Sequence, residues 1–141
     1  MNKKFKETII KIAREIRNDI YHGEYMAKYY FTDKNLTSRN EKGVVAAEIE
    51  ISSTYLNYTI TFYAPIYDMF KNKDYKGVVE IICHEICHLL TEPLYKLLGD
   101  SITNNNLSHY ESIKEQQTQR ITNIAMCMIE KKEYIKMLKN I

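Results

Sequence analysis

The sequence predicts a single α+β domain over residues 1–141, in which a small, mainly antiparallel sheet of three strands packs against helices. Three observations predict this class: helical spacing of apolar residues at both ends of the chain, alternation of apolar and polar residues near its middle, and an almost wholly apolar helix after that. With 141 residues, 45% of them apolar and 27% charged, the chain is long enough for one modest core.

The first element is an amphipathic helix over 5–20, packed on the sheet, with lysine and arginine on its other side. Three strands are predicted next, over 24–31, 44–52 and 56–63. The last two are expected to pair antiparallel, because both alternate apolar and polar side chains and so have one wet face. The polar stretch 32–43 is predicted to be a loop. The apolar residues that define the first helix are Phe5, Ile9, Ile12, Ala13, Ile16 and Ile20.

From the end of the sheet onward the chain is predicted to be helical. Pro93 is expected to stop the buried helix, because proline disfavours helix at the residue before it. Asparagines at 104–106 predict a loop over 100–107, and the C-terminal tail is expected to fray. The predicted helical segments are 66–71, 78–90, 94–98, 108–131 and 133–141.

The buried helix carries the motif H-E-x-x-H at residues 84–88. Residues four apart share one face of a helix, so His84 and His88 can direct two imidazoles at one metal ion. Glu85 lies about 100° round the helix from His84, where its carboxylate can reach a water molecule held by that ion. Two nitrogen ligands, a general base and an open position form the arrangement of zinc hydrolases. The alternative is a core helix whose histidines hydrogen-bond to neighbouring backbone.

A third protein ligand is expected, since two histidines do not complete a zinc site. Glu115 is the first choice, because it begins a stripe that should face the core, and a carboxylate directed inward needs a partner. His109, Glu111 and other downstream residues are the alternatives. Glu111 has another role available, since Ser108 and Glu111 form an S-x-x-E capping box. The remaining members of the stripe are Thr118, Thr122, Ala125 and Ile129.

Two further groups of residues stand near the motif. His109 and Tyr110 begin the long helix, where either can donate a hydrogen bond to an oxyanion, although they can also be plain helix-end residues. Cys83 and Cys87 each precede a histidine and point about 100° away from it. We therefore expect them to be small core residues rather than metal ligands.

Composition disfavours several classes of function. A net charge of +2 is too small to argue for binding to nucleic acid or to an acidic membrane. No apolar run approaches the roughly 18 residues of a membrane span, and no apolar segment with a cleavage site follows the charged start. An odd number of cysteines, three, fits a reducing cytoplasm, that of a bacterium or of a phage-infected host. The sequence gives no signal for an oligomeric state.

The order of helix, small sheet, H-E-x-x-H helix, loop and helix with an early glutamate resembles the zincin-like domains of phage metallopeptidases. These are distant relatives of the SprT-like and ImmA/IrrE-type peptidases. The resemblance spans about residues 3–130, and its specific parts are the H-E-x-x-H motif and an E-x-x-T-x-x-I segment beginning at Glu115. It implies a gluzincin-type site in which His84, His88 and Glu115 hold Zn²⁺ and Glu85 is the catalytic base.

Two related families differ from this chain at specific positions, and these differences limit which family it can resemble. Metzincins have Gly and His where this chain has Thr91 and Leu94, so that family is excluded. SprT domains use a third histidine, for which His109 is the only candidate. The resemblance implies a zinc metallopeptidase that hydrolyses peptide bonds in a peptide or protein substrate. The alternative is a catalytically inactive zinc-binding or protein-interaction module of the same fold.

Overall fold

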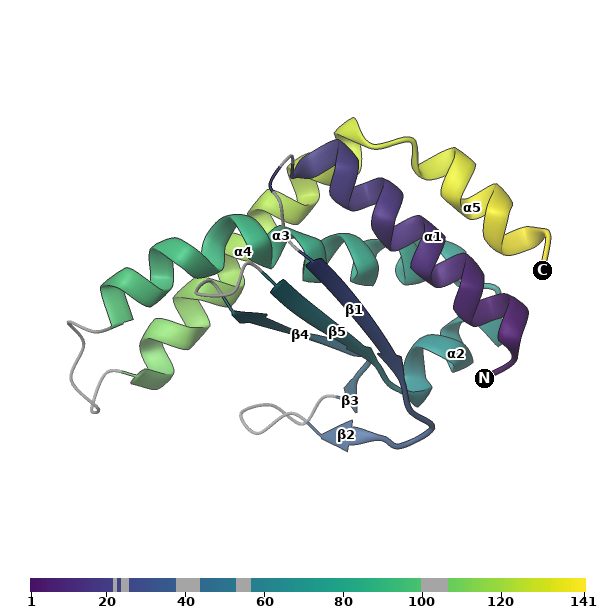
Figure 1. Ribbon diagram of the computed structural model, residues 1–141, viewed down its shortest axis with the longest axis horizontal. Helices are drawn as coiled ribbons and strands as arrows, with labels where there is room; N and C mark the ends of the chain where they lie inside the picture. The colour runs from purple at the N-terminus through teal and green to yellow at the C-terminus, as the bar shows by residue number, and fades with distance from the viewer. Residues whose placement is uncertain (22, 24–25, 38–43, 53–56, 100–106) are drawn as a thin grey trace.

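The computed structural model describes residues 1–21, 23, 26–37, 44–52, 57–99 and 107–141. Within these residues the protein is an α+β structure with five helices and a three-stranded sheet (Figure 1). Helices α1 and α5 lie side by side, and α4 crosses α3. In chain order the elements are α1 (Lys3–Ile20), β1 (Met26–Phe31), β2 (Leu36–Thr37), β3 (Val44–Val45), β4 (Ala47–Ser52), β5 (Asn57–Phe62), α2 (Ala64–Lys71), α3 (Tyr75–Gly99), α4 (Leu107–Met128) and α5 (Lys131–Lys139).

The three-stranded sheet has the order β1-β5-β4 and is mixed, so the predicted mainly antiparallel sheet is wrong. The β4–β5 pair is antiparallel, as predicted, with Ile49 opposite Ile60. The β1–β5 pair is parallel, with Tyr29 opposite Ile60. Strands β1 and β5 run in the same direction, and β4 runs in the opposite one. Because β1 lies beside β5, the two form a parallel ladder. Strand β5 takes the centre because its alternate residues Tyr58, Ile60 and Phe62 are fully buried.

Two strand boundaries also differ from the prediction. The range 44–52 is not one strand, because it breaks at Ala46 into β3 and β4, and the Ala46 carbonyl accepts a hydrogen bond from the Tyr63 amide at 3.0 Å. The predicted loop over 32–43 contains β2, which pairs antiparallel with β3. Parts of the predicted strands and loops, at 24–25, 38–43, 56 and 100–106, lie outside the described residues.

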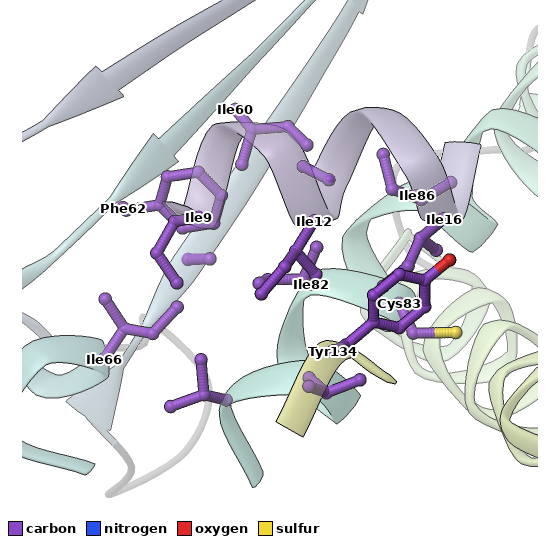
Figure 2. Packing of buried hydrophobic residues seen from close by; sticks show 14 of the residues in the cluster. Ile9, Ile12, Ile16, Ile60, Phe62, Ile66, Ile82, Cys83, Ile86 and Tyr134 are labelled. Atoms are coloured by element: carbon purple, nitrogen blue, oxygen red, sulfur yellow. The ribbon is translucent and has the colours of Figure 1, made fainter. Parts of the chain in front are cut away.

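The core forms where α1, β5 and α3 meet, and it confirms the apolar stripe predicted for the first helix. Ile9, Ile12 and Ile16 of α1 are fully buried, together with Ile60 of β5 and Ile82 of α3. Figure 2 shows these side chains pointing into one shared interior. The middle of α3 is therefore held in place by apolar packing before any polar group is considered.

Helix α3 runs through Pro93, so the predicted stop at this proline and the separate segment 94–98 are both wrong. Proline removes one backbone hydrogen bond from a helix. Contacts between α3 and α4 on both sides of the proline offset that loss. They are the Thr91–Thr118 hydroxyl contact at 3.0 Å, the Lys114–Glu92 ion pair at 3.0 Å, and the Tyr95–Tyr110 ring pair with centroids 5.4 Å apart.

The C-terminal part also differs from the prediction. The predicted helix over 108–131 ends at Met128, and α5 begins at Lys131. The tail does not fray, because Tyr134 and Leu138 of α5 are buried and the Lys4 ammonium donates to the Asn140 carbonyl at 2.9 Å. In the part of the chain that the structure describes, no helix combines the length and the apolar character that a membrane crossing needs.

Candidate metal centre

The packing of α3 on α4 brings His84, His88 and Glu115 together. Glu115 Oε2 lies 3.4 Å from His84 Nε2 and 3.6 Å from His88 Nε2. The two imidazole rings stand nearly perpendicular, with centroids 4.9 Å apart. One ligand atom from each of the three residues lies within 4.8 Å of the other two. The sequence predicted this grouping, and the structure contains it.

The spacing of these atoms suits a divalent cation. Ligand atoms bound about 2.0–2.1 Å from a tetrahedral Zn²⁺ lie roughly 3.4 Å from one another. The distances from Glu115 to the two histidines, 3.4 and 3.6 Å, are close to that value before any ion is added. Two imidazole nitrogens and one carboxylate oxygen are also a donor set that zinc uses in catalytic sites. The three residues can therefore hold a metal ion, and its identity is a separate question.

Exposure increases across the cluster, so one side of it is open. The side chain of His88 is 9% exposed, that of His84 is 21% exposed and that of Glu115 is 53% exposed. Among the described residues, no fourth histidine, cysteine, aspartate or glutamate joins the group. Three protein ligands and an accessible side are typical of a catalytic metal site, whereas structural zinc sites are closed by four protein ligands.

Each histidine also has a partner for its second ring nitrogen. Thr122 Oγ1 lies 3.5 Å from His84 Nδ1, and Thr118 Oγ1 lies 3.4 Å from His88 Nδ1. Both threonine side chains are fully buried. Sequence reasoning directed the two threonines toward the core, as the structure confirms, but assigned them no role. The available signal was the matching four-residue spacing of two histidines on one helix and two threonines on another.

Glu85 is buried beside the cluster, and its environment favours the neutral acid. Its side chain accepts a hydrogen bond from the backbone of Ile49 in β4. Burial raises the pKa of the Glu85 carboxyl to about 7, and the neighbouring His84 opposes part of that rise. A carboxyl group with a pKa near neutrality can both accept and return a proton at neutral pH, as a general base and acid must.

Without a bound metal ion, burial and neighbouring charged groups shift the pKa values of all three clustered residues. Burial lowers the pKa of His88 to about 4, so its imidazole is neutral at pH 7. Burial also lowers the pKa of His84, but the hydrogen bond to Glu115 and the nearby carboxylates outweigh it and raise that pKa. Burial alone would raise the pKa of Glu115, but the two histidines and Lys114 lower it. A negative carboxylate facing two imidazoles is an arrangement that attracts a cation.

The other residues considered from the sequence lie apart from this group or have other contacts. His109 and Glu111 are exposed on α4 and are not members of the three-residue group. Tyr110 packs edge-on against Tyr95. The donor roles of His109 and Tyr110 remain predictions, and the capping box does too, because the Ser108 side chain lies outside the described part. Cys83 and Cys87 are fully buried, as predicted for core residues.

Comparison with protein-family models, with curated proteins and with solved structures finds no match to this chain. The three clustered side chains and Glu85 are therefore the features of this chain that bear on its function. These four residues come from two helices, and both histidines and Glu85 belong to one short motif.

Proposed function

We propose that the protein is a zinc-dependent metallopeptidase with a zincin-like fold. The observation that carries the proposal is the meeting of His84, His88 and Glu115 beside the buried carboxyl group of Glu85. The resemblance of the H-E-x-x-H motif and of the following glutamate segment to phage-type metallopeptidases supports the same reading. The mixed sheet and the helix carrying the motif are compatible with it.

The residues divide the chemistry between them. His84, His88 and Glu115 would hold the ion through two nitrogens and one oxygen. A bound Zn²⁺ supplies Lewis acidity, which lowers the pKa of its water toward about 7 and makes that water a nucleophile. Glu85 would take the proton from the attacking water at its carboxylate and return it to the amine that leaves. In the metal-free protein, burial raises the pKa of Glu85 to about 7. A cation bound beside it would favour the carboxylate, which is the form that a general base needs.

Strand β4, at one edge of the described sheet and next to Glu85, offers an extended peptide a place to bind. Strand β5 lies in the middle of the sheet, so the predicted strand over 56–63 cannot accept another strand. Strand β4 pairs only with β5 among the described strands of that sheet, and it packs against α3. A substrate added to the β4 edge would receive main-chain hydrogen bonds. The Ile49 contact places this strand next to the proposed base.

The variant Glu85→Gln tests the proposal. It should bind zinc with wild-type stoichiometry, because Glu85 is not one of the three clustered ligands. It should lose cleavage of fluorescein-labelled casein by a factor of about 10² or more, the range expected for removing a general base. The matched control is Glu80→Gln, which changes the same side chain on the same helix outside the cluster and should cleave as the wild type does.

Two results would contradict the proposal. Equal cleavage by the wild type and Glu85→Gln would remove Glu85 from the mechanism. Zinc bound at one ion per chain, with no cleavage of casein by the zinc-loaded wild type, would favour the alternative of a zinc-binding or protein-interaction module. Zinc content is measured by plasma emission spectrometry on the same samples, so binding and chemistry are scored separately.

A further inference from the structure

Two buried threonines on α4 stand opposite the two histidines of α3. Thr118 and Thr122 are four residues apart, as His84 and His88 are, so both pairs occupy one helical turn. Because α4 packs antiparallel to α3 at this point, Thr118 meets His88 and Thr122 meets His84. Threonine is a weak helix former, and both hydroxyl groups are fully buried in the interior of a helix. Stability of the helix alone does not explain their presence.

The position of each hydroxyl proton follows from its bond to the backbone. Thr122 also bonds to the side chain of Cys87, whose sulfur is a weaker acceptor than a carbonyl oxygen. Thr122 Oγ1 donates to the Thr118 carbonyl at 2.8 Å, and Thr118 Oγ1 donates to the Lys114 carbonyl at 3.1 Å. A hydroxyl group has one proton and two lone pairs. With its proton directed at the backbone, each oxygen can only accept from the imidazole nitrogen that faces it. A ring that bonds to its threonine must then carry its proton on Nδ1. In the metal-free protein Nε2 of His84 also faces the Glu115 carboxylate at 3.4 Å and can donate to it instead, so the Nδ1–H form of His84 is the one that a cation between Nε2 and Glu115 requires.

A third threonine completes this arrangement at His88. Thr91 Oγ1 lies 3.0 Å from Thr118 Oγ1 and 3.5 Å from the His88 carbonyl oxygen, and its one proton serves the shorter contact. Thr118 Oγ1 therefore has one acceptor for its own proton and room to accept from both Nδ1 of His88 and Thr91. The hydroxyl group of Thr91 reaches the backbone of His88 and does not reach an imidazole nitrogen in either of these contacts.

We propose that Thr118 and Thr122 are positioning residues that accept from Nδ1–H of His88 and His84, so that both Nε2 lone pairs can bind a cation held together with Glu115. The inference rests on the proposed metal centre and names the residues that orient its two histidine ligands. Metal-bound histidines ordinarily donate their second nitrogen to an outer partner, which fixes both the tautomer and the ring orientation. Here the partners are neutral hydroxyl groups back-bonded to their own helix, rather than carboxylates.

The experiment separates the shape of each threonine side chain from the hydrogen bonding of its hydroxyl group. Thr118→Val and Thr122→Val keep the branched shape and remove the hydroxyl group, whereas Thr118→Ser and Thr122→Ser keep the hydroxyl group and remove a buried methyl group. Zinc affinity is measured by competition with a chromophoric chelator. The valine variants should bind zinc about 10- to 100-fold more weakly, the range seen for loss of an outer partner. The serine variants should retain wild-type affinity and melt at lower temperature.

The matched control is Thr91→Val, which removes a buried hydroxyl group from the same layer. Its zinc affinity should stay closer to wild type than that of either valine variant at 118 or 122. A second readout needs no zinc: long-range ¹H–¹⁵N spectra of histidine-labelled protein, at a pH above both imidazole pKa values, report the tautomer of each ring. The diagnostic ring is His88, because Nε2 of His84 can donate to Glu115 when no metal is bound. The wild type should show Nδ1–H on His88, and Thr118→Val should lose this preference.

Each outcome decides the inference. Unchanged zinc affinity in both valine variants would overturn the inference. An Nε2–H tautomer at His88 in the metal-free wild type would also overturn it, and that measurement does not depend on the folding of any variant. Serine variants that lose as much affinity as the valine variants would assign the effect to packing and also overturn it. A wild type that binds no zinc but shows Nδ1–H on His88 would refute the metal centre and leave the positioning role of Thr118 standing.

Discussion

Helix α3 has two sides that differ in kind. One side faces α1 and the sheet with fully buried Ile82 and Ile86, and its contacts are apolar apart from the bond between Glu85 and the backbone of Ile49. The other side faces α4, where His84 and His88 meet threonine hydroxyl groups and the Glu115 carboxylate. Packing on the apolar side holds the helix in place, and this keeps the histidines of the polar side opposite Glu115 and the threonines.

The two sides of α3 are expected to contribute differently to the stability of the fold and to its function. Burying apolar surface stabilises a fold by about 25 cal/mol per Å². Buried polar groups contribute little net stability when paired and destabilise by roughly 1–3 kcal/mol when a partner is missing. A polar layer between two helices is thus a poor way to gain stability. Its retention beside a well-packed core is explained if the layer binds an ion, and substitutions on the two sides should then behave differently.

The largest expected effect is loss of zinc-dependent stabilisation in His88→Ala. Zinc present at 1,000 times its dissociation constant should stabilise the wild type by about 4 kcal/mol. The variant should gain almost nothing from zinc, because one of the three clustered nitrogen and oxygen donors is gone. Thermal unfolding with and without zinc measures this difference. A full zinc shift in His88→Ala would contradict the assignment of the polar side.

The apolar side should give the opposite pattern. Ile82→Ala removes a fully buried side chain from the core and should lower the free energy of unfolding by about 2–5 kcal/mol. Its stabilisation by zinc should match that of the wild type, since Ile82 is not part of the metal-binding group. Urea unfolding at fixed zinc concentrations checks both statements. Loss of the zinc shift here would mean that the two sides of α3 are not separable.

The third prediction concerns the pH dependence of the metal-free protein. Burial raises the pKa of Glu85 from 4.5 to about 7, so folding disfavours its carboxylate. The resulting loss of stability is absent below pH 4.5, grows between pH 4.5 and 7, and is complete above pH 7, where it amounts to about 3 kcal/mol. Glu85→Gln removes this contribution. The stability of the variant relative to the wild type should therefore rise with pH across that window, and a constant difference would refute the raised pKa.

The smallest effect is expected at the Lys114–Glu92 ion pair. This pair joins α4 to α3 at 3.0 Å, and its side chains are 21% and 32% exposed. Glu92→Gln should change the free energy of unfolding by about 1 kcal/mol or less, since partly exposed ion pairs contribute little. Zinc binding should persist. Urea unfolding measures the difference, and a loss larger than that of Ile82→Ala would reverse the comparison between the two sides.

The parts of this structure that local spacing determines could be predicted from the sequence. The stripe on α1 follows from helical periodicity, which the chain shows clearly. Periodicity also directed Glu115 inward, and the need for a third metal ligand then placed it with the two histidines. Periodicity also predicted that Thr118 and Thr122 would face the core, and both are buried. Such patterns work because a helix repeats its geometry whatever surrounds it.

The parts that depend on contacts between distant segments could not be predicted. The parallel β1–β5 ladder depends on which strand takes the centre, and no residue of β1 encodes that choice alone. Continuation of α3 through Pro93 depends on contacts that α4 supplies. The pairing of Thr118 with His88 needs the register of two helices, which spacing within one helix does not provide.

The most direct test of the metal centre is an anomalous difference map measured at the zinc absorption edge on crystals of the zinc-loaded protein. The account predicts one peak per chain, about 2.0–2.2 Å from Nε2 of His84, Nε2 of His88 and a carboxylate oxygen of Glu115. A map without a peak between these three side chains, or with its peak at other residues, would contradict it.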